Sequence, residues 1–203
     1  FDPDKSSADE LVKTVLSAEE RAKLTPDQIL QDFLDGNERF RNNNLTHRDH
    51  SEQIRKSAFG QYPKAVVVSC LDSRVPVEDV FVNEDLLGSL EFACKVAGAK
   101  LIIIMGHQHC GAVIGAIDDV KLGNLTTTLS KIKPAIRMSQ NYKGNMTSKN
   151  EEFVKIVSEN NVRHAISTIR SKSPILKEME ENGEIKIVGL FYTLTKGELI
   201  FVD

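Results

Sequence analysis

The N-terminal part of the chain carries apolar residues at helical spacing, with polar residues on the opposite face. Ser17 and Glu20 have the spacing of a capping box, which marks the first turn of a helix. Thr25 and Pro26 suit the N-cap and first position of a second helix. The apolar stripe of this second helix comprises Ile29, Leu30, Phe33, Leu34 and Phe40. We therefore predict an N-terminal helical arm over residues 1–45.

Two short apolar runs in the middle of the chain have the character of buried strands. The runs 65–70 (AVVVSC) and 101–105 (LIIIM) contain almost no polar residue, as expected for parallel strands covered on both faces. Between them, apolar residues recur at helical spacing up to Gly98, which is a typical helix C-terminal residue. We expect Gly106 to end the second strand and another helix to follow from about His109. This order of elements predicts a right-handed βαβ crossover.

The rest of the chain alternates helices and strands in the same way. Helical spacing continues over 125–136, where Pro134 predicts a kink, and a longer helix is expected over 153–169. The third predicted strand is 185–194, and a Lys-Gly turn leads into a last edge strand at 199–202. Together the elements predict an α/β fold. Its mainly parallel central sheet is flanked by helices on both faces and ends in an antiparallel edge hairpin.

The length and composition of the chain support one globular domain. We assign residues 1–203 to this domain, with residues 60–203 as its core. Hydrophobic residues make up 40% and charged residues 27%, as in ordinary soluble proteins. The formal charge of −3 gives no reason to expect a nucleic-acid partner. No apolar run suits a membrane span and no signal peptide is visible, so we expect a soluble protein without a membrane partner. It would be cytoplasmic, or periplasmic if a leader was removed.

The cysteines point to metal chemistry rather than to disulfides. There are three of them, Cys70, Cys94 and Cys110, and an odd number does not form a disulfide framework. Cys94 lies on the apolar face of a predicted helix and is assigned to the core. Cys70 and the pair His107 and Cys110 follow the two buried strands. Because the carboxyl ends of parallel strands meet at one edge of a sheet, we expect these three residues to converge.

Two thiolates and one imidazole form a ligand set that suits Zn²⁺. Three protein ligands leave the fourth tetrahedral position for water, which distinguishes a catalytic zinc from a structural one. Zinc lowers the pKa of a bound water from 15.7 toward about 7. Since two thiolates cancel the charge of the ion, this zinc should be a weaker Lewis acid than one held by three histidines. We therefore expect an alkaline-shifted rate profile.

Asp72 and Arg74 follow the first candidate ligand and complete the predicted site. Asp72 is close enough in sequence to reach the metal or its water. An aspartate without a partner would compete as a fourth ligand, and Arg74 could hold it away through a charge-assisted pair. Asp72 would then accept a hydrogen bond from the zinc-bound hydroxide and orient it. A purely structural Asp72–Arg74 pair is the alternative.

The sequence resembles the β-class carbonic anhydrases from about Pro26 to its C-terminus. The resemblance rests on CLDSR at 70–74, SLEFA at 89–93 and GHQHCGAV at 106–113. It implies zinc ligands at Cys70, His107 and Cys110 and a catalytic dyad of Asp72 and Arg74, with His109 outside the ligand set. It also implies reversible hydration of carbon dioxide to bicarbonate by zinc-bound hydroxide, and a homodimer or dimer of dimers.

One segment of the chain departs from the family pattern. The family has a longer stretch between its two half-motifs, whereas here Val80-Phe81 runs almost directly into Val82-Asn83. By the resemblance, roughly fifteen residues are absent, about the length of one strand and its loops. Either these residues are disordered and left out of the sequence, which we favour, or they are deleted from the protein.

Two alternatives to a carbonic anhydrase follow from these observations. A true deletion would favour a catalytically silent zinc-binding or scaffold protein. A relative of the family could also hydrolyse an analogue of carbon dioxide, such as carbon disulfide. Whether Asp72 binds the zinc as a fourth ligand is left open by the sequence.

Overall fold

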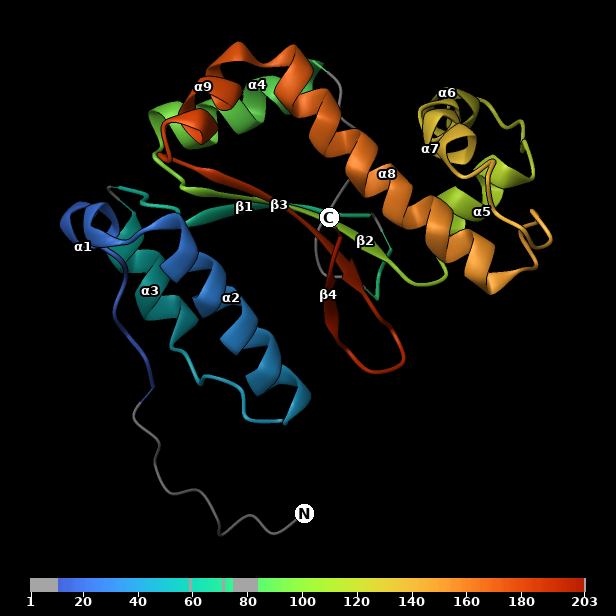
Figure 1. Cartoon of the computed structure of the whole chain (residues 1–203). Coiled ribbons are helices and arrows are strands. Elements are labelled where there is room, and N and C mark those ends of the chain that lie inside the picture. The colour runs from blue at the N-terminus through green and yellow to red at the C-terminus, as the bar shows by residue number, and fades with distance from the viewer. Residues whose placement is uncertain (1–10, 59, 71, 75–83, 203) are drawn as a thin grey trace, which may run out of the picture.

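The computed structural model describes residues 11–58, 60–70, 72–74 and 84–202 of the chain. Within these residues a single sheet has the strand order β1-β2-β3-β4 (Figure 1). The strands are β1 (Ala65–Val68), β2 (Leu101–His107), β3 (Lys186–Tyr192) and β4 (Leu199–Phe201). The first three pair in parallel, and β4 pairs with β3 antiparallel. The predicted α/β fold with an antiparallel edge hairpin is confirmed.

Strand β2 lies in the centre of the sheet and is longer than its sequence pattern indicates. We expected Gly106 to end this strand, and that boundary is wrong, because Gly106 pairs with Phe191 and the ladder continues to His107. A Cβ atom on Gly106 would lie 2.9 Å from a methyl carbon of Val162, on the helix above. The glycine therefore permits close helix packing rather than stopping the strand.

The N-terminal helices lie on one face of the sheet (Figure 1). They are α1 (Ala18–Lys23), α2 (Pro26–Arg41) and α3 (His50–Ser57). Both predicted capping boxes are present, at Ser17 and at Thr25. Ile29 and Leu30 of α2 are buried in the apolar cluster that β2 and β3 form on this face. The hydrophobic pattern did not predict α3, because that helix buries no side chain.

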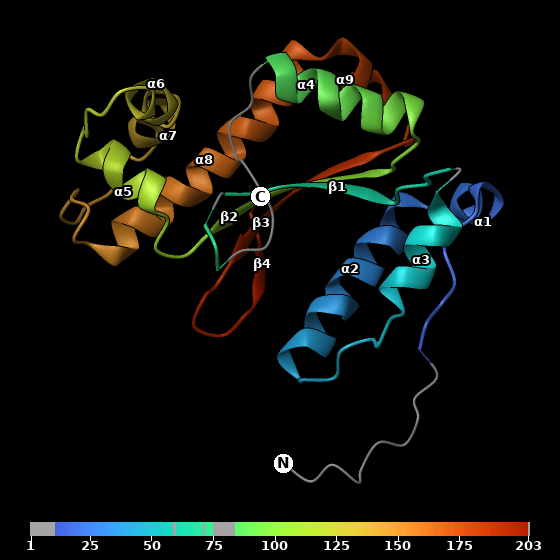
Figure 2. The same ribbon diagram turned by 180° about the vertical axis from the view of Figure 1, so that it is seen from behind.

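The opposite face of the sheet is covered by helices from the middle and C-terminal parts of the chain (Figure 2). They are α4 (Glu84–Glu91), its π-helical continuation η1 (Phe92–Val96), α8 (Glu151–Lys172) and α9 (Pro174–Glu181). The chain leaves η1 through Gly98, whose φ of 79° favours glycine, as its predicted place at a helix C-terminus requires. The side chain of Asn150 caps α8 by accepting from the amides of Glu152 and Phe153. Helices therefore cover both faces, as expected.

Three short helices gather beside one end of α8 in both views of the ribbon (Figures 1 and 2). They are α5 (Gly111–Ile117), α6 (Leu125–Ser130) and α7 (Lys133–Met138). The expected single kinked helix over 125–136 is wrong: Pro134 lies in the first turn of a separate helix. A proline lacks an amide hydrogen, so it fits a helix start better than a helix interior.

The core consists of apolar layers on the two faces of β2, all seven residues of which are buried. Alternate residues of β2 enter different clusters: Leu101 and Ile103 face α2, whereas Ile102 and Ile104 face α8. Such burial of both faces explains why the strand is an unbroken apolar run.

The segment in which the chain departs from its relatives, at Phe81–Val82, lies outside the described residues. Its two explanations therefore stay open.

None of the described helices has the length and hydropathy that are needed to cross a membrane.

Candidate metal centre

The three predicted ligands come from the carboxyl ends of β1 and β2 and from the helix that follows β2. Cys70 lies two residues beyond the end of β1, and His107 is the last residue of β2. Cys110 is the N-cap residue of α5. Because β1 and β2 are parallel neighbours, their ends bring together residues that are 37 or more positions apart in the sequence.

The ligand atoms of Cys70, His107 and Cys110 all lie within 4.8 Å of one another. The Sγ atoms of Cys70 and Cys110 are 3.8 Å apart, and neither cysteine is in a disulfide. Two sulfurs bound at about 2.3 Å to one tetrahedral zinc are about 3.8 Å apart, so the observed spacing suits this ion. In the part of the chain that the structure describes, these residues form the one cluster of histidine, cysteine and acidic side chains able to hold a metal.

The ring of His107 has one nitrogen engaged and one free. Its Nδ1 atom lies 2.9 Å from the carbonyl oxygen of Gln108, which fixes Nδ1 as the donor when the ring is neutral. The lone pair is then on Nε2, which is buried and has no hydrogen-bond partner among the described residues. A buried polar nitrogen without a partner is costly unless it binds something. This atom therefore fits a metal ion.

The two thiols of the centre share one proton when no metal neutralises them. Hydrogen bonding from Cys110, with a further contribution from His107, lowers the pKa of Cys70 to about 4. Bonding to Cys70 and burial raise the pKa of Cys110, since a second thiolate would lie beside the first. The amides of Val113 and Ala112 in α5 oppose this rise. A divalent cation would remove the repulsion, because both sulfurs could then bind it as thiolates.

Burial acts to lower the pKa of His107, but the Cys70 thiolate and the Gln108 carbonyl outweigh it and raise that pKa. The same negative charge that favours a proton on His107 would favour a cation at its free nitrogen. The centre therefore combines one imidazole nitrogen with two sulfurs, a set of ligands that suits zinc.

Asp72 and Arg74 form a bidentate ion pair beside the three ligands. Arg74 Nε lies 2.8 Å from Asp72 Oδ1, and Arg74 Nη2 lies 2.5 Å from Asp72 Oδ2. The backbone amide of Arg74 also donates to Oδ1. These bonds hold the pKa of Asp72 well below its usual range. Asp72 Oδ2 is 3.9 Å from His107 Nδ1, so the carboxylate lies alongside the candidate centre.

The remaining residues that the sequence singled out lie apart from the ligand cluster. His109 occupies the turn between two ligands with a φ of 55° and is not among the clustered residues. Cys94 is buried in the apolar cluster beneath α4 and α9.

Sequence reasoning missed Gln108, whose side chain accepts hydrogen bonds from Thr195. Its place between two ligands was the available signal. Nothing in the sequence indicates Thr195.

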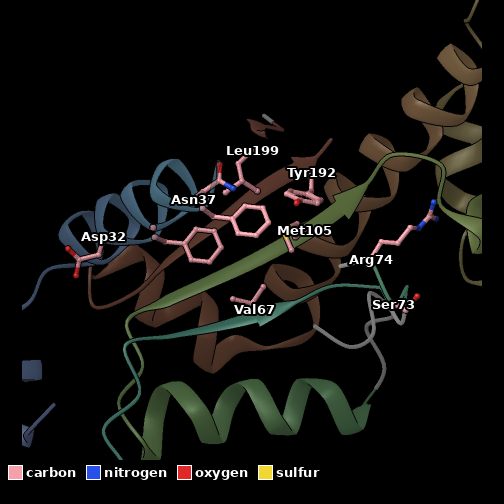
Figure 3. A pocket seen from close by; sticks show the side chains of 11 residues that line it. Asp32, Asn37, Val67, Ser73, Arg74, Met105, Tyr192 and Leu199 are labelled. Atoms are coloured by element: carbon pink, nitrogen blue, oxygen red, sulfur yellow. The ribbon is translucent and has the colours of Figure 1, made fainter. Parts of the chain in front are cut away.

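An apolar cavity of about 620 Å³ lies between α2 and the sheet and reaches Ser73 and Arg74 at one end. Figure 3 shows Val67 and Met105 on adjacent strands, with Asn37 on α2 facing them. The guanidinium of Arg74 points away from these apolar side chains (Figure 3), and it pairs with the carboxylate of Asp72. An apolar cavity therefore lies next to the candidate centre, on the face of the sheet that α2 covers.

Comparisons with known proteins find a matching family and similar sequences. The family described as carbonic anhydrase matches residues 81–199, a range that includes His107 and Cys110 but not Cys70, Asp72 or Arg74. Carbonic anhydrase 2 of Mycobacterium tuberculosis is 29% identical over 83% of this chain and 89% of its own length. The carbonic anhydrase of Mycolicibacterium smegmatis is 28% identical over 81% and 87%.

Solved structures support the fold. The β-carbonic anhydrase CcaA has a TM-score of 0.65 at 22% identity, covering 85% of this chain and 86% of that chain. A structure from a study of two tetrameric β-carbonic anhydrases of Sordaria macrospora has a TM-score of 0.61 at 20% identity, covering 85% and 96%. Both likenesses concern the arrangement of the sheet and its helices.

Proposed function

The chain belongs to the carbonic anhydrase family, and we propose that it interconverts carbon dioxide and bicarbonate at a zinc ion held by Cys70, His107 and Cys110. The observation that carries the proposal is the buried Nε2 of His107, which has no hydrogen-bond partner among the described residues, beside two sulfurs 3.8 Å apart. Zinc bound there supplies a Lewis acid that lowers the pKa of water and so provides a nucleophile near neutral pH.

Asp72 is proposed to orient that nucleophile as a hydrogen-bond acceptor. Its side chain is 13% exposed, and Arg74 keeps it ionised, so it can accept but not donate. An acceptor fixed on one side of the water would direct a lone pair toward the carbon of the substrate. The role of Asp72 is therefore geometric, with the proton of the reaction leaving to solvent by other groups.

Arg74 is proposed to prevent Asp72 from binding the zinc. Both carboxylate oxygens are engaged by the guanidinium, which leaves neither free to become a fourth ligand without breaking the pair. The fourth position of the metal would then stay available for water. In Arg74→Ala we expect the carboxylate to bind the metal, and the visible spectrum of the cobalt-substituted protein would report the change.

Stopped-flow hydration of carbon dioxide by the zinc-loaded protein tests the proposed activity. We expect a rate that requires zinc and increases toward alkaline pH, because two thiolates weaken the Lewis acidity of the ion. A zinc-loaded protein with no hydration would favour the scaffold alternative. Turnover of carbon disulfide without turnover of carbon dioxide would favour the analogue hydrolase.

For the assembly, we propose a homodimer or dimer of dimers in which the N-terminal arm, residues 1–45, takes part. The Sordaria macrospora proteins are described as tetrameric, which supports an oligomer. Helix α2 also packs on the sheet of its own chain through Ile29 and Leu30. Mass measurement in solution, with and without residues 1–24, tests the arm: an unchanged oligomer after deletion would remove this role.

A further inference from the structure

Gln108 joins the metal centre to the turn between β3 and β4 through its backbone amide, its backbone carbonyl and its side-chain oxygen. Its backbone amide donates to the carbonyl of Tyr192 at 2.9 Å. Its backbone carbonyl accepts from His107 Nδ1 at 2.9 Å. Its side-chain Oε1 accepts from both the amide and the hydroxyl of Thr195, each at 3.3 Å. One residue therefore contacts a candidate metal ligand and a segment 87 positions away.

The turn that carries Gln108 begins where the β2–β3 ladder ends and contains one residue in a strained conformation. The β2–β3 ladder ends at the pair His107 and Tyr192. His109, which follows Gln108, has a φ of 55°, a left-handed conformation that is strained for a residue other than glycine. A strained turn persists only where surrounding contacts hold it. The bonds from Gln108 to Tyr192 and Thr195 are such contacts.

We infer that Gln108 and Thr195 form a brace that positions His107 for metal binding. This inference rests on the proposed function, since it concerns the same metal centre. The Gln108 carbonyl fixes the proton of His107 on Nδ1 and so leaves the lone pair on Nε2 for the ion. Histidine ligands of metals are generally oriented in this way by a partner of the second nitrogen. Gln108 and Thr195 are positioning residues, because they act through His107.

The brace does not merely close the β3–β4 turn. That turn is closed by its own bonds, from the Thr193 amide to the Glu198 carbonyl at 2.9 Å and from the Gly197 amide to the Thr193 carbonyl at 2.8 Å. The Thr193 hydroxyl also accepts from the Glu198 amide at 3.0 Å. Thr193 therefore offers a matched control: it supports the same turn, and among the described residues it makes no hydrogen bond with residues 107–110.

Zinc affinity, measured by competition with a chromogenic chelator, tests the brace without using activity. We expect Gln108→Ala to bind zinc about tenfold more weakly, at the lower end of the effect of residues that orient metal ligands. Thr195→Val should have a smaller effect, because its backbone amide can still donate. Gln108→Glu should stay within about threefold of the wild type, since a carboxylate oxygen accepts both bonds. Thr193→Val should leave the affinity unchanged.

The cobalt-substituted protein gives a second readout, since its visible absorption depends on ligand geometry. We expect an altered spectrum in Gln108→Ala and the wild-type spectrum in Gln108→Glu and Thr193→Val. Wild-type zinc affinity in Gln108→Ala would overturn the brace, as would an equal loss in Thr193→Val. Zinc binding without carbon dioxide hydration in the wild type would overturn the activity but leave the brace standing. A wild-type protein that binds no zinc would overturn both.

Discussion

The chain places thiols in two regions that have opposite chemistry. At the carboxyl ends of β1 and β2, neighbouring groups lower the pKa of Cys70 to about 4. In the apolar layer beneath η1, burial raises the pKa of Cys94 to about 11. Cys94 is buried and Cys70 is half-buried, but burial acts to raise the pKa of both thiols, so burial alone does not explain the difference. What differs is whether polar partners or only apolar side chains surround the sulfur.

The comparison shows how a reactive region can be recognised in a folded protein. Around Cys94, apolar side chains fill the space and leave the thiol neutral. Around Cys70, a second thiol and an imidazole nitrogen lie within 4.8 Å, and that nitrogen has no hydrogen-bond partner among the described residues. Such an arrangement is unfavourable by itself and becomes favourable when a cation binds. The predictions below test this contrast.

The largest expected effect is the loss of zinc when a sulfur of the centre is removed. In Cys70→Ser, we expect zinc to bind at least about 100-fold more weakly, a larger loss than that of residues that only orient a ligand. The measurement is chelator competition, with metal content by mass spectrometry. Cys94→Ser is the matched control and should keep wild-type affinity. An undiminished zinc content in Cys70→Ser would contradict the ligand assignment.

A second prediction separates the metal from the residue that orients the nucleophile. In Asp72→Asn, we expect kcat/KM for carbon dioxide hydration to fall by roughly 100-fold, with zinc content unchanged. Because Arg74 holds the pKa of Asp72 low, the wild-type carboxylate stays ionised at neutral and alkaline pH. The alkaline rise of the wild-type rate should therefore not reflect Asp72. Stopped-flow assays across pH check both statements, and a wild-type rate in Asp72→Asn would reduce the pair to a structural role.

The third prediction concerns the reactivity of the two kinds of thiol. With a pKa of about 11, Cys94 gains thiolate about tenfold for each pH unit between 7 and 9, so its alkylation should accelerate by the same factor. In metal-free protein, Cys70 is already a thiolate above a pKa of about 4, and its alkylation should barely change over this range. Peptide mapping after iodoacetamide treatment measures both rates. A Cys94 rate that levels off by pH 8 would show that burial does not control this thiol.

The smallest expected effect is on stability. Cys94→Ala removes one buried sulfur from an apolar cluster, and we expect the free energy of unfolding to fall by about 1–2 kcal/mol. Urea denaturation measures this change, and zinc affinity should stay at the wild-type value. A zinc loss in this variant would mean that the two regions are coupled.

Sequence patterns predicted those elements of the fold well that depend on interactions between residues close together in the sequence. The capping boxes at Ser17 and Thr25 were correct, because they involve residues three positions apart. The prediction that Gly106 ends β2 was wrong, since only the approach of Val162 from α8 explains a glycine inside this strand. Helix α3 was missed because its residues bury no apolar face.

For the candidate site, the sequence by itself determined which residues are the candidate ligands and the strand ends on which they lie. Buried apolar runs placed Cys70 after one strand and His107 with Cys110 at the end of another, since parallel strands end at one edge. Only the tertiary structure decided which nitrogen of His107 has no hydrogen-bond partner among the described residues, and that Gln108 bonds to Thr195. Those facts depend on hydrogen bonds between distant segments, whose geometry is set when helices and strands pack, and no local pattern of residues encodes it.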